Sequence, residues 1–213
     1  MSSPRRTFPS FYLVLLLAAV SLSYLASRYP YFPGDVYISR AVQSIQDPSF
    51  DFLMRAVSAV GQRLPGSLTV LSCAAALWML RYKWEALFSI SSFLADGIVI
   101  VLKQVIGRPR PSPDLVVVLE TIQQTGFPSA HVVHFVVFYG FLFFLAWRLM
   151  RPGSLRTILL VLLAGAIGLV GLSRIYLGAH WASDVLGGYL VGGLWLAAQV
   201  RVYGRVARTG IAD

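Results

Sequence analysis

The feature that most constrains this chain is a series of long apolar runs, separated by short breaks rich in charged, proline or glycine residues. A helix needs about 20 apolar residues to cross the roughly 30 Å hydrocarbon core of a bilayer, because each residue advances it by about 1.5 Å. Six runs approach this length. They cover residues 11–26, 64–80, 84–102, 132–150, 155–172 and 181–203. We therefore expect an all-α bundle of six transmembrane helices.

Composition indicates one integral membrane domain over residues 1–213. Hydrophobic residues make up 57% of the chain and charged residues only 13%, whereas about 25% charged residues is usual in soluble domains. The first run follows Arg5 and Arg6, as in a signal peptide, but no small-x-small cleavage site ends it and five further runs follow. We expect this first helix to be retained.

The segment of residues 36–60 is amphipathic rather than continuously apolar. Asp47 and Pro48 divide it, and an aspartate followed by a proline is typical of a helix N-cap and first helical residue. We expect two short helices here that lie at the membrane interface.

The net charge of +9 follows from the way that Lys and Arg hold loops in the cytoplasm. On one predicted face these residues sit close to the ends of the spans, and on the other they are spread over longer loops. The first group contains Arg5, Arg6, Arg81, Lys83, Arg148, Arg151, Arg156, Arg201, Arg205 and Arg208. We expect both termini in the cytoplasm and a multi-pass protein of the cell (inner) membrane. No basic stripe interleaves with exposed aromatic residues, so we expect no nucleic-acid partner, and nothing implies an obligatory protein partner.

Three polar pieces fall on the opposite, non-cytoplasmic face of the predicted bundle. They are KQVIGRPRP at residues 103–111, FPSAH at 127–131 and SRIYLGAHWASD at 173–184. Each piece lies at the end of a predicted span, so the helices bring together residues that are far apart in the sequence. We expect one polar site at this end of the bundle.

The residue types in these pieces suit an anion better than a metal ion. Asp184 is their only carboxylate, and Mg²⁺ or Ca²⁺ needs several oxygen ligands. A zinc site with two histidines and Asp184 is conceivable, but the neighbouring cations would repel the metal. Lys103, Arg110 and Arg174 can surround phosphate oxygens, and Ser129 adds a donor at the start of a helix.

Two histidines could then act on the bound phosphate. His180 and Asp184 are four residues apart, so on a helix they share a face, and the carboxylate can orient the imidazole as a nucleophile. His131 would serve as the general acid for the leaving oxygen, because its intrinsic pKa lies near neutrality.

In their order and spacing, these motifs resemble the three-part signature of the type 2 phosphatidic acid phosphatase superfamily, which also includes vanadium haloperoxidases. The matching residues are Lys103-x6-Arg110-Pro111, Pro128-Ser129-Ala130-His131 and Ser173-Arg174-x5-His180-x3-Asp184. The resemblance implies an integral-membrane lipid phosphatase in which Lys103, Arg110, Ser129, Ala130 and Arg174 bind phosphate. It further implies that His180 forms a phosphohistidine, Asp184 orients His180 and His131 protonates the leaving group. No metal and no cofactor is implied.

The substrate implied is a phosphomonoester or pyrophosphate of a membrane lipid. We expect undecaprenyl pyrophosphate, narrowly ahead of phosphatidylglycerophosphate and phosphatidic acid. A lipid A phosphatase or a lipid phosphotransferase could use the same residues, and a transport or lipid-binding protein could use the cations only to hold phosphate.

Four further residues depart from the family pattern or lie outside it. Ala130 replaces the usual glycine of the family pattern, and it keeps the backbone N–H unless the turn needs a positive φ. For Arg108 we expect a structural or headgroup-binding role. Asp96 lies inside a span, where an acid is costly. It could orient Lys103 two turns away or bond another helix, and we expect the structural role. His134 either lines the pocket or bonds a neighbouring helix.

Overall fold

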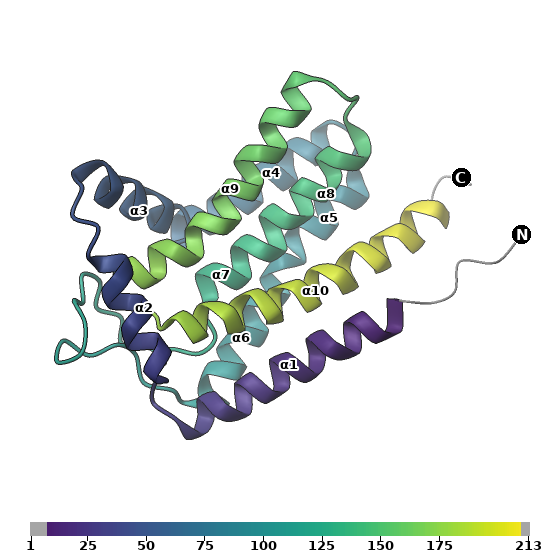
Figure 1. The fold of residues 1–213 in the computed structure, drawn as a ribbon. Coiled ribbons are helices and arrows are strands. Elements are labelled where there is room, and N and C mark those ends of the chain that lie inside the picture. The colour runs from purple at the N-terminus through teal and green to yellow at the C-terminus, as the bar shows by residue number, and fades with distance from the viewer. Residues whose placement is uncertain (1–7, 210–213) are drawn as a thin grey trace, which may run out of the picture.

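A computed structural model describes residues 8–209, and all regular elements in that range are helices (Figure 1). In chain order they are α1 (Phe8–Arg28), α2 (Pro33–Gln43), α3 (Pro48–Val60), α4 (Arg63–Met79), α5 (Lys83–Ile90), α6 (Ser92–Ile106), α7 (Ala130–His134), the π-helical turn η1 (Phe135–Tyr139), α8 (Gly140–Leu149), α9 (Ser154–Tyr176) and α10 (Ala182–Thr209). The predicted all-α class is confirmed.

Five helical stretches, rather than the six predicted, are long and apolar enough to cross a membrane. They are Phe11–Arg28, Lys83–Ile106, Ala130–Leu149, Ser154–Tyr176 and Ala182–Ala207. The second run predicted from the sequence forms α4, whose 17 residues are shorter than the usual crossing of about 20. The third contains α5 and α6, which meet at Ser91.

The helix formed by α7, η1 and α8 is the centre of the bundle. In an 18-residue window of this stretch 67% of the residues are buried, against 33% or less in the corresponding windows of the other four. Its valines Val132 and Val136 pack against α9 and α10 through Val170 and Val185. At Gly188 and Gly192 of α10, an added Cβ would lie within 3 Å of these two valines. The close approach of α10 to the central helix therefore requires glycine there.

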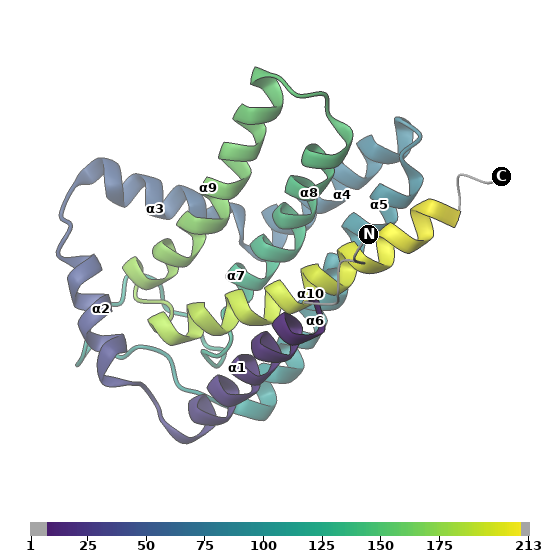
Figure 2. The same cartoon turned by 45° about the vertical axis from the view of Figure 1, so that its right-hand side comes forward.

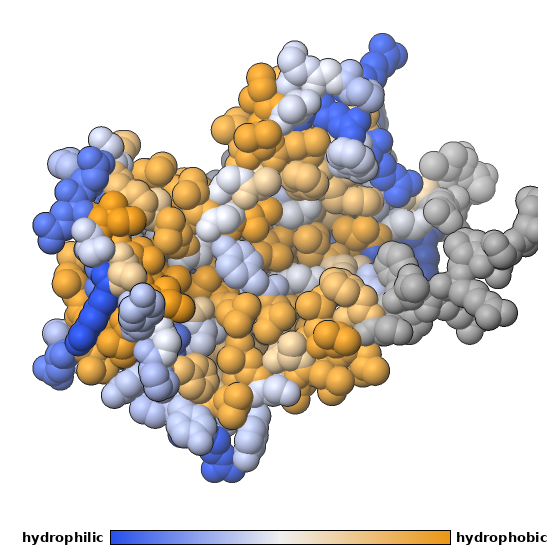
Figure 3. Space-filling model, viewed as in Figure 1, coloured by the Kyte–Doolittle hydropathy of each residue, from blue (hydrophilic) through white to orange (hydrophobic). Residues whose placement is uncertain are grey.

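The helices run back and forth between two ends of the molecule (Figures 1 and 2). One end holds the start of α1, the end of α10 and the turns α4–α5 and α8–α9. The other end holds α2, α3, the long 107–129 connection and the α9–α10 turn. Large apolar side chains remain exposed between the ends, among them Leu13, Leu17, Val161 and Leu162, and the surface in Figure 3 is mostly apolar there. This surface fits a lipid environment.

The two helices predicted between residues 36 and 60 are present as α2 and α3. Pro48 is the first residue of α3, and the Asp47 carboxylate accepts a hydrogen bond from the Phe50 backbone N–H (2.8 Å), so the predicted N-cap is confirmed. Met54 of α3 packs on Tyr176 and Leu177 at the end of α9. The placement of α2 and α3 at a membrane surface stays a prediction. Arg5 and Arg6, used for the orientation, lie outside the described residues.

Candidate active site

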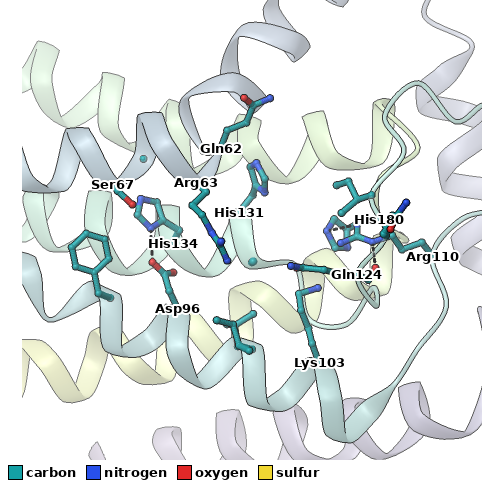
Figure 4. A pocket seen from close by; sticks show the side chains of 18 residues that line it. Gln62, Arg63, Ser67, Asp96, Lys103, Arg110, Gln124, His131, His134 and His180 are labelled. Carbon is teal, nitrogen blue, oxygen red and sulfur yellow. Dashed lines mark hydrogen bonds and ion pairs between the residues drawn. The ribbon is translucent and has the colours of Figure 1, made fainter.

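The three polar motifs meet at the end of the bundle that carries the long 107–129 connection. Lys103 lies in the last turn of α6, His131 in the first turn of the central helix and Arg174 in the last turn of α9. His180 lies in the short α9–α10 connection, and Asp184 lies in the first turn of α10. Figure 4 shows Lys103, Arg110, His131 and His180 around one cavity.

His180 has its two ring nitrogens in different environments. Its Nδ1 faces the Asp184 Oδ2 atom at 3.4 Å, and its Nε2 lies 3.0 Å from Arg110 Nη1. A guanidinium can only donate hydrogen bonds, so Nε2 must be the acceptor and the proton of the neutral ring belongs on Nδ1. The Nε2 lone pair therefore faces the cations, and the carboxylate holds the opposite side of the ring. This is the tautomer that a nucleophilic imidazole needs.

Asp184 is fully buried and, besides facing His180, is held by two other groups. Its Oδ1 accepts from Arg108 Nη1 at 2.5 Å, and its Oδ2 also accepts from the Trp181 backbone N–H at 3.1 Å. Arg108, in turn, donates to the buried Asp35 carboxylate at 3.0 Å. Arg108 thus contacts the carboxylate that faces His180. The sequence did not predict this role of Asp35, which lies in α2, about 150 residues before Asp184. An acidic residue in the first turn of a helix is common and does not indicate a distant partner.

The three cations predicted to bind phosphate are anchored by backbone carbonyls or polar side chains. Lys103 Nζ donates to the carbonyls of Thr125 (2.6 Å) and Gly126 (3.1 Å), and Arg110 donates to those of Gln124 and Ala179.

Arg174 donates from Nη1 to Ser58 Oγ and to Glu120 Oε2. Ser58 and Glu120 were not predicted. Both belong to segments that approach Arg174 only in the fold.

The cations gathered around His180 lower the pKa values of groups at the site. Burial, followed by the charges of Arg110, Lys103 and Arg174, holds the pKa of His180 well below its usual value of 6.5. Burial and the Arg174 charge lower the pKa of Arg110 to about 10. At neutral pH the imidazole is therefore neutral and Arg110 remains charged, which is the combination suited to attack on a phosphate.

Several buried polar side-chain atoms at this site make no hydrogen bond with any of residues 8–209. They are Ser129 Oγ, His131 Nε2, Arg174 Nε and Arg174 Nη2. Buried polar groups normally find partners, so four such atoms at the meeting point of the motifs indicate a site for a polyvalent acceptor such as phosphate. Ala130 does not have a positive φ. Its backbone therefore does not need the glycine that is usual in the family pattern.

A cavity of about 640 Å³ extends from His180 past His131 to α4. The Asp96 carboxylate lines it and lies 3.1 Å from His134 Nδ1. The predicted bond from Asp96 to another helix is confirmed, and His134 both makes this bond and lines the cavity. Arg63 and Gln62 also line the cavity (Figure 4). Over residues 8–209, no three His, Cys, Asp or Glu side chains lie close enough to hold a metal ion.

Comparison with known proteins shows which family this chain belongs to. The model of the PAP2 superfamily matches residues 82–208. Phosphatidylglycerophosphatase B of Bacillus subtilis (strain 168) is 27% identical over 183 residues, 85% of this chain and 86% of that protein. Decaprenylphosphoryl-5-phosphoribose phosphatase of Mycobacterium tuberculosis is 31% identical over 172 residues, 79% of this chain and 89% of that protein.

A shorter match has higher identity. The putative undecaprenyl-diphosphatase YbjG of Escherichia coli is 43% identical over 75 residues, 35% of this chain and 33% of that protein. Among solved structures, the transmembrane PAP2 type phosphatidylglycerolphosphate phosphatase from Bacillus subtilis superposes with a TM-score of 0.78 at 23% identity, covering 92% of this chain and 96% of that one. That likeness shows a common fold. The chain belongs to the PAP2 superfamily and is an integral-membrane lipid phosphatase of that family.

Proposed function

We propose that this phosphatase works through a phosphohistidine at His180. The observation that carries the proposal is the hydrogen bond between Arg110 Nη1 and His180 Nε2. In this bond the Nε2 lone pair points toward the cations. A phosphate bound there would take over the Arg110 N–H and free the lone pair for attack, while the Nδ1–H of the ring faces Asp184. The buried, unpartnered donors of Ser129 and Arg174 support the binding of a phosphate in the same place.

In the first step, the Nε2 lone pair of His180 forms a bond to phosphorus and the bond from phosphorus to the leaving oxygen breaks. His131 Nε2 gives its proton to that oxygen. A water molecule then attacks the phosphohistidine, His131 takes the proton from the water, and the N–P bond breaks to release inorganic phosphate. Lys103, Arg110 and Arg174 stabilise the charge on the transferred oxygens, and no metal takes part.

For the substrate we expect a lipid with a terminal phosphate, with undecaprenyl pyrophosphate ahead of phosphatidylglycerophosphate and phosphatidic acid. The names of the three relatives describe lipids that carry two phosphates, which supports the first two. We place the site on the periplasmic or extracellular face and both termini in the cytoplasm. The helix ends that carry Arg81, Lys83, Arg148 and Arg151 lie opposite the site, which supports this orientation.

Phosphate release from the purified full-length protein in detergent with EDTA tests the proposal. We expect release from at least one of undecaprenyl pyrophosphate, phosphatidylglycerophosphate, phosphatidic acid and lipid A, and a loss of at least about a thousandfold in kcat for His180→Gln. Release by His180→Gln at the wild-type rate would show that His180 is not the nucleophile. Inactivity of the wild type in EDTA would contradict a metal-independent reaction.

A further inference from the structure

We propose that Arg63, at the start of α4, binds the second, retained phosphate of a lipid substrate that carries two phosphates. This inference rests on the proposed reaction at His180. It assigns a specificity role to a residue outside the three motifs, and it makes this enzyme selective for two-phosphate lipids over lipids with one phosphate.

The first observation is the position of Arg63 on the leaving-group side of the site. The segment before α4 runs directly against the proposed general acid, because a Cβ added to Gly61 would lie only 2.5 Å from His131 Cδ2. Arg63 follows two residues later and lines the cavity that His180, His131 and Lys103 also line. In Figure 4 its side chain is drawn between Lys103 and the Asp96–His134 pair. Since His131 protonates the leaving oxygen, the retained part of the substrate extends toward Arg63.

The second observation is that the Arg63 guanidinium has no partner. Lys103 and Arg110, the other two cations that line the cavity, are each bound to backbone carbonyls. The Arg63 guanidinium makes no hydrogen bond and no ion pair with any residue of the 8–209 range. A free guanidinium beside a phosphate-transfer site can donate two parallel hydrogen bonds to a second phosphate.

The third observation limits where that phosphate can lie. Beyond Arg63 the cavity meets the carboxylate of Asp96, whose side chain is 33% exposed. A negative charge there disfavours an anion deeper in the cavity. The remaining lining includes the apolar side chains of Phe93, Val99 and Ile100, which suit a hydrocarbon chain. The cavity therefore offers cations for the transferred phosphate, one cation for a retained phosphate and apolar side chains for a hydrocarbon chain.

Matched substrate pairs test the inference on the full-length protein in detergent. Farnesyl diphosphate and farnesyl monophosphate share one hydrocarbon, and phosphatidylglycerophosphate and phosphatidic acid share another. We expect Arg63→Gln to lower kcat/KM about ten- to a hundredfold for the two-phosphate member of each pair, which is the usual effect of removing one charge-assisted hydrogen bond. The one-phosphate members should change by less than about threefold, and Arg63→Lys should be intermediate.

Arg55→Gln is the matched control, because Arg55 lies on α3 at the same end, is paired with Asp51 and does not line the cavity. It should leave all four values unchanged. Inhibition adds a readout that needs no turnover of the probe: Arg63→Gln should weaken inhibition by methylenediphosphonate and leave inhibition by inorganic phosphate unchanged.

Equal losses for both members of each pair, or unchanged inhibition by methylenediphosphonate, would overturn the role of Arg63. Hydrolysis of one-phosphate lipids alone by the wild type would overturn it as well. Failure of the reaction itself gives a different pattern, in which His180→Gln stays active or the wild type hydrolyses no lipid.

Discussion

At the scale of single residues, the site depends on contacts that reach beyond its three motifs. The motif residues could be singled out from the sequence, because each motif lies at the end of a predicted span and combines cations, histidines or a hydroxyl. Asp35, Ser58 and Glu120 could not, since a lone carboxylate or hydroxyl has no periodicity that points to a distant partner. For Arg108 the sequence predicts a structural or headgroup-binding role, and in the fold Arg108 joins Asp184 to Asp35.

Arg108→Met should strongly destabilise the protein. Arg108 is 1% exposed and pairs with two buried carboxylates, and removing one partner from a buried ion pair usually costs about 3–5 kcal/mol. We expect a lower Tm in detergent. The double variant Arg108→Met with Asp35→Asn should recover part of the loss, because one uncompensated charge is removed.

Arg55→Met, which breaks the exposed pair with Asp51, serves as the control and should leave the Tm unchanged. A Tm for Arg108→Met equal to that of the wild type would show that the buried pair does not stabilise the fold.

The environment of His180 predicts a pH dependence of stability. The pKa of His180 is held well below 6.5 in the folded protein, whereas in the unfolded chain it is about 6.5. Below pH 6.5 the unfolded chain therefore binds a proton that the folded protein does not bind, and stability falls as the pH falls. We expect the Tm to drop between pH 6.5 and 5, and His180→Asn to reduce the slope. An identical slope in that variant would contradict the assignment.

At the scale of elements, the 107–129 connection is held against the helices that carry the site. The Leu119 backbone N–H donates to the Leu177 carbonyl at 2.9 Å, and Gln43 of α2 donates to the Val117 carbonyl at 2.7 Å. The acceptors of these bonds are backbone carbonyls, so the pattern of side chains in the sequence does not predict them. The connection also carries Glu120, which holds Arg174.

Gly178→Ala should disturb this packing. Gly178 has a φ of +65°, and a Cβ there would lie 2.1 Å from the Val117 carbonyl oxygen. Both the backbone conformation and the clash disfavour a side chain, and strain of this kind costs of the order of 1–3 kcal/mol. We expect a lower Tm and a reduced kcat, because the adjacent His180 would shift.

Gly165→Ala, within α9, is the control for Gly178→Ala in the turn that follows α9. A Cβ at Gly165 would meet nothing within 4 Å, so this variant should keep the wild-type Tm and kcat. Equal behaviour of the two alanine variants would show that the contact between the α9–α10 turn and residues 116–118 does not matter for the site.

At the scale of the whole molecule, the long apolar segments could be predicted from the sequence, but the number of helices long enough to cross a membrane could not. Five of the predicted runs appear as long apolar helices, because chain length and hydropathy alone determine whether a helix can cross a bilayer. The run at 64–80 forms the shorter α4. Its packing against α5 is a tertiary feature that hydropathy does not record. Successive helices run in opposite directions, so the span ends that carry the three motifs lie at the same end of the bundle. The position of the candidate site could therefore be predicted from the sequence.

Trapping of the phosphoenzyme tests the central claim most directly. Wild-type protein is mixed with phosphatidylglycerophosphate or undecaprenyl pyrophosphate, quenched rapidly in alkali, digested and analysed by mass spectrometry. We predict one phosphate on the peptide that contains His180, and a larger trapped fraction in His131→Ala with a substrate whose leaving group needs no protonation. A phosphate on another residue, or full turnover without any phosphorylated His180, would contradict the account.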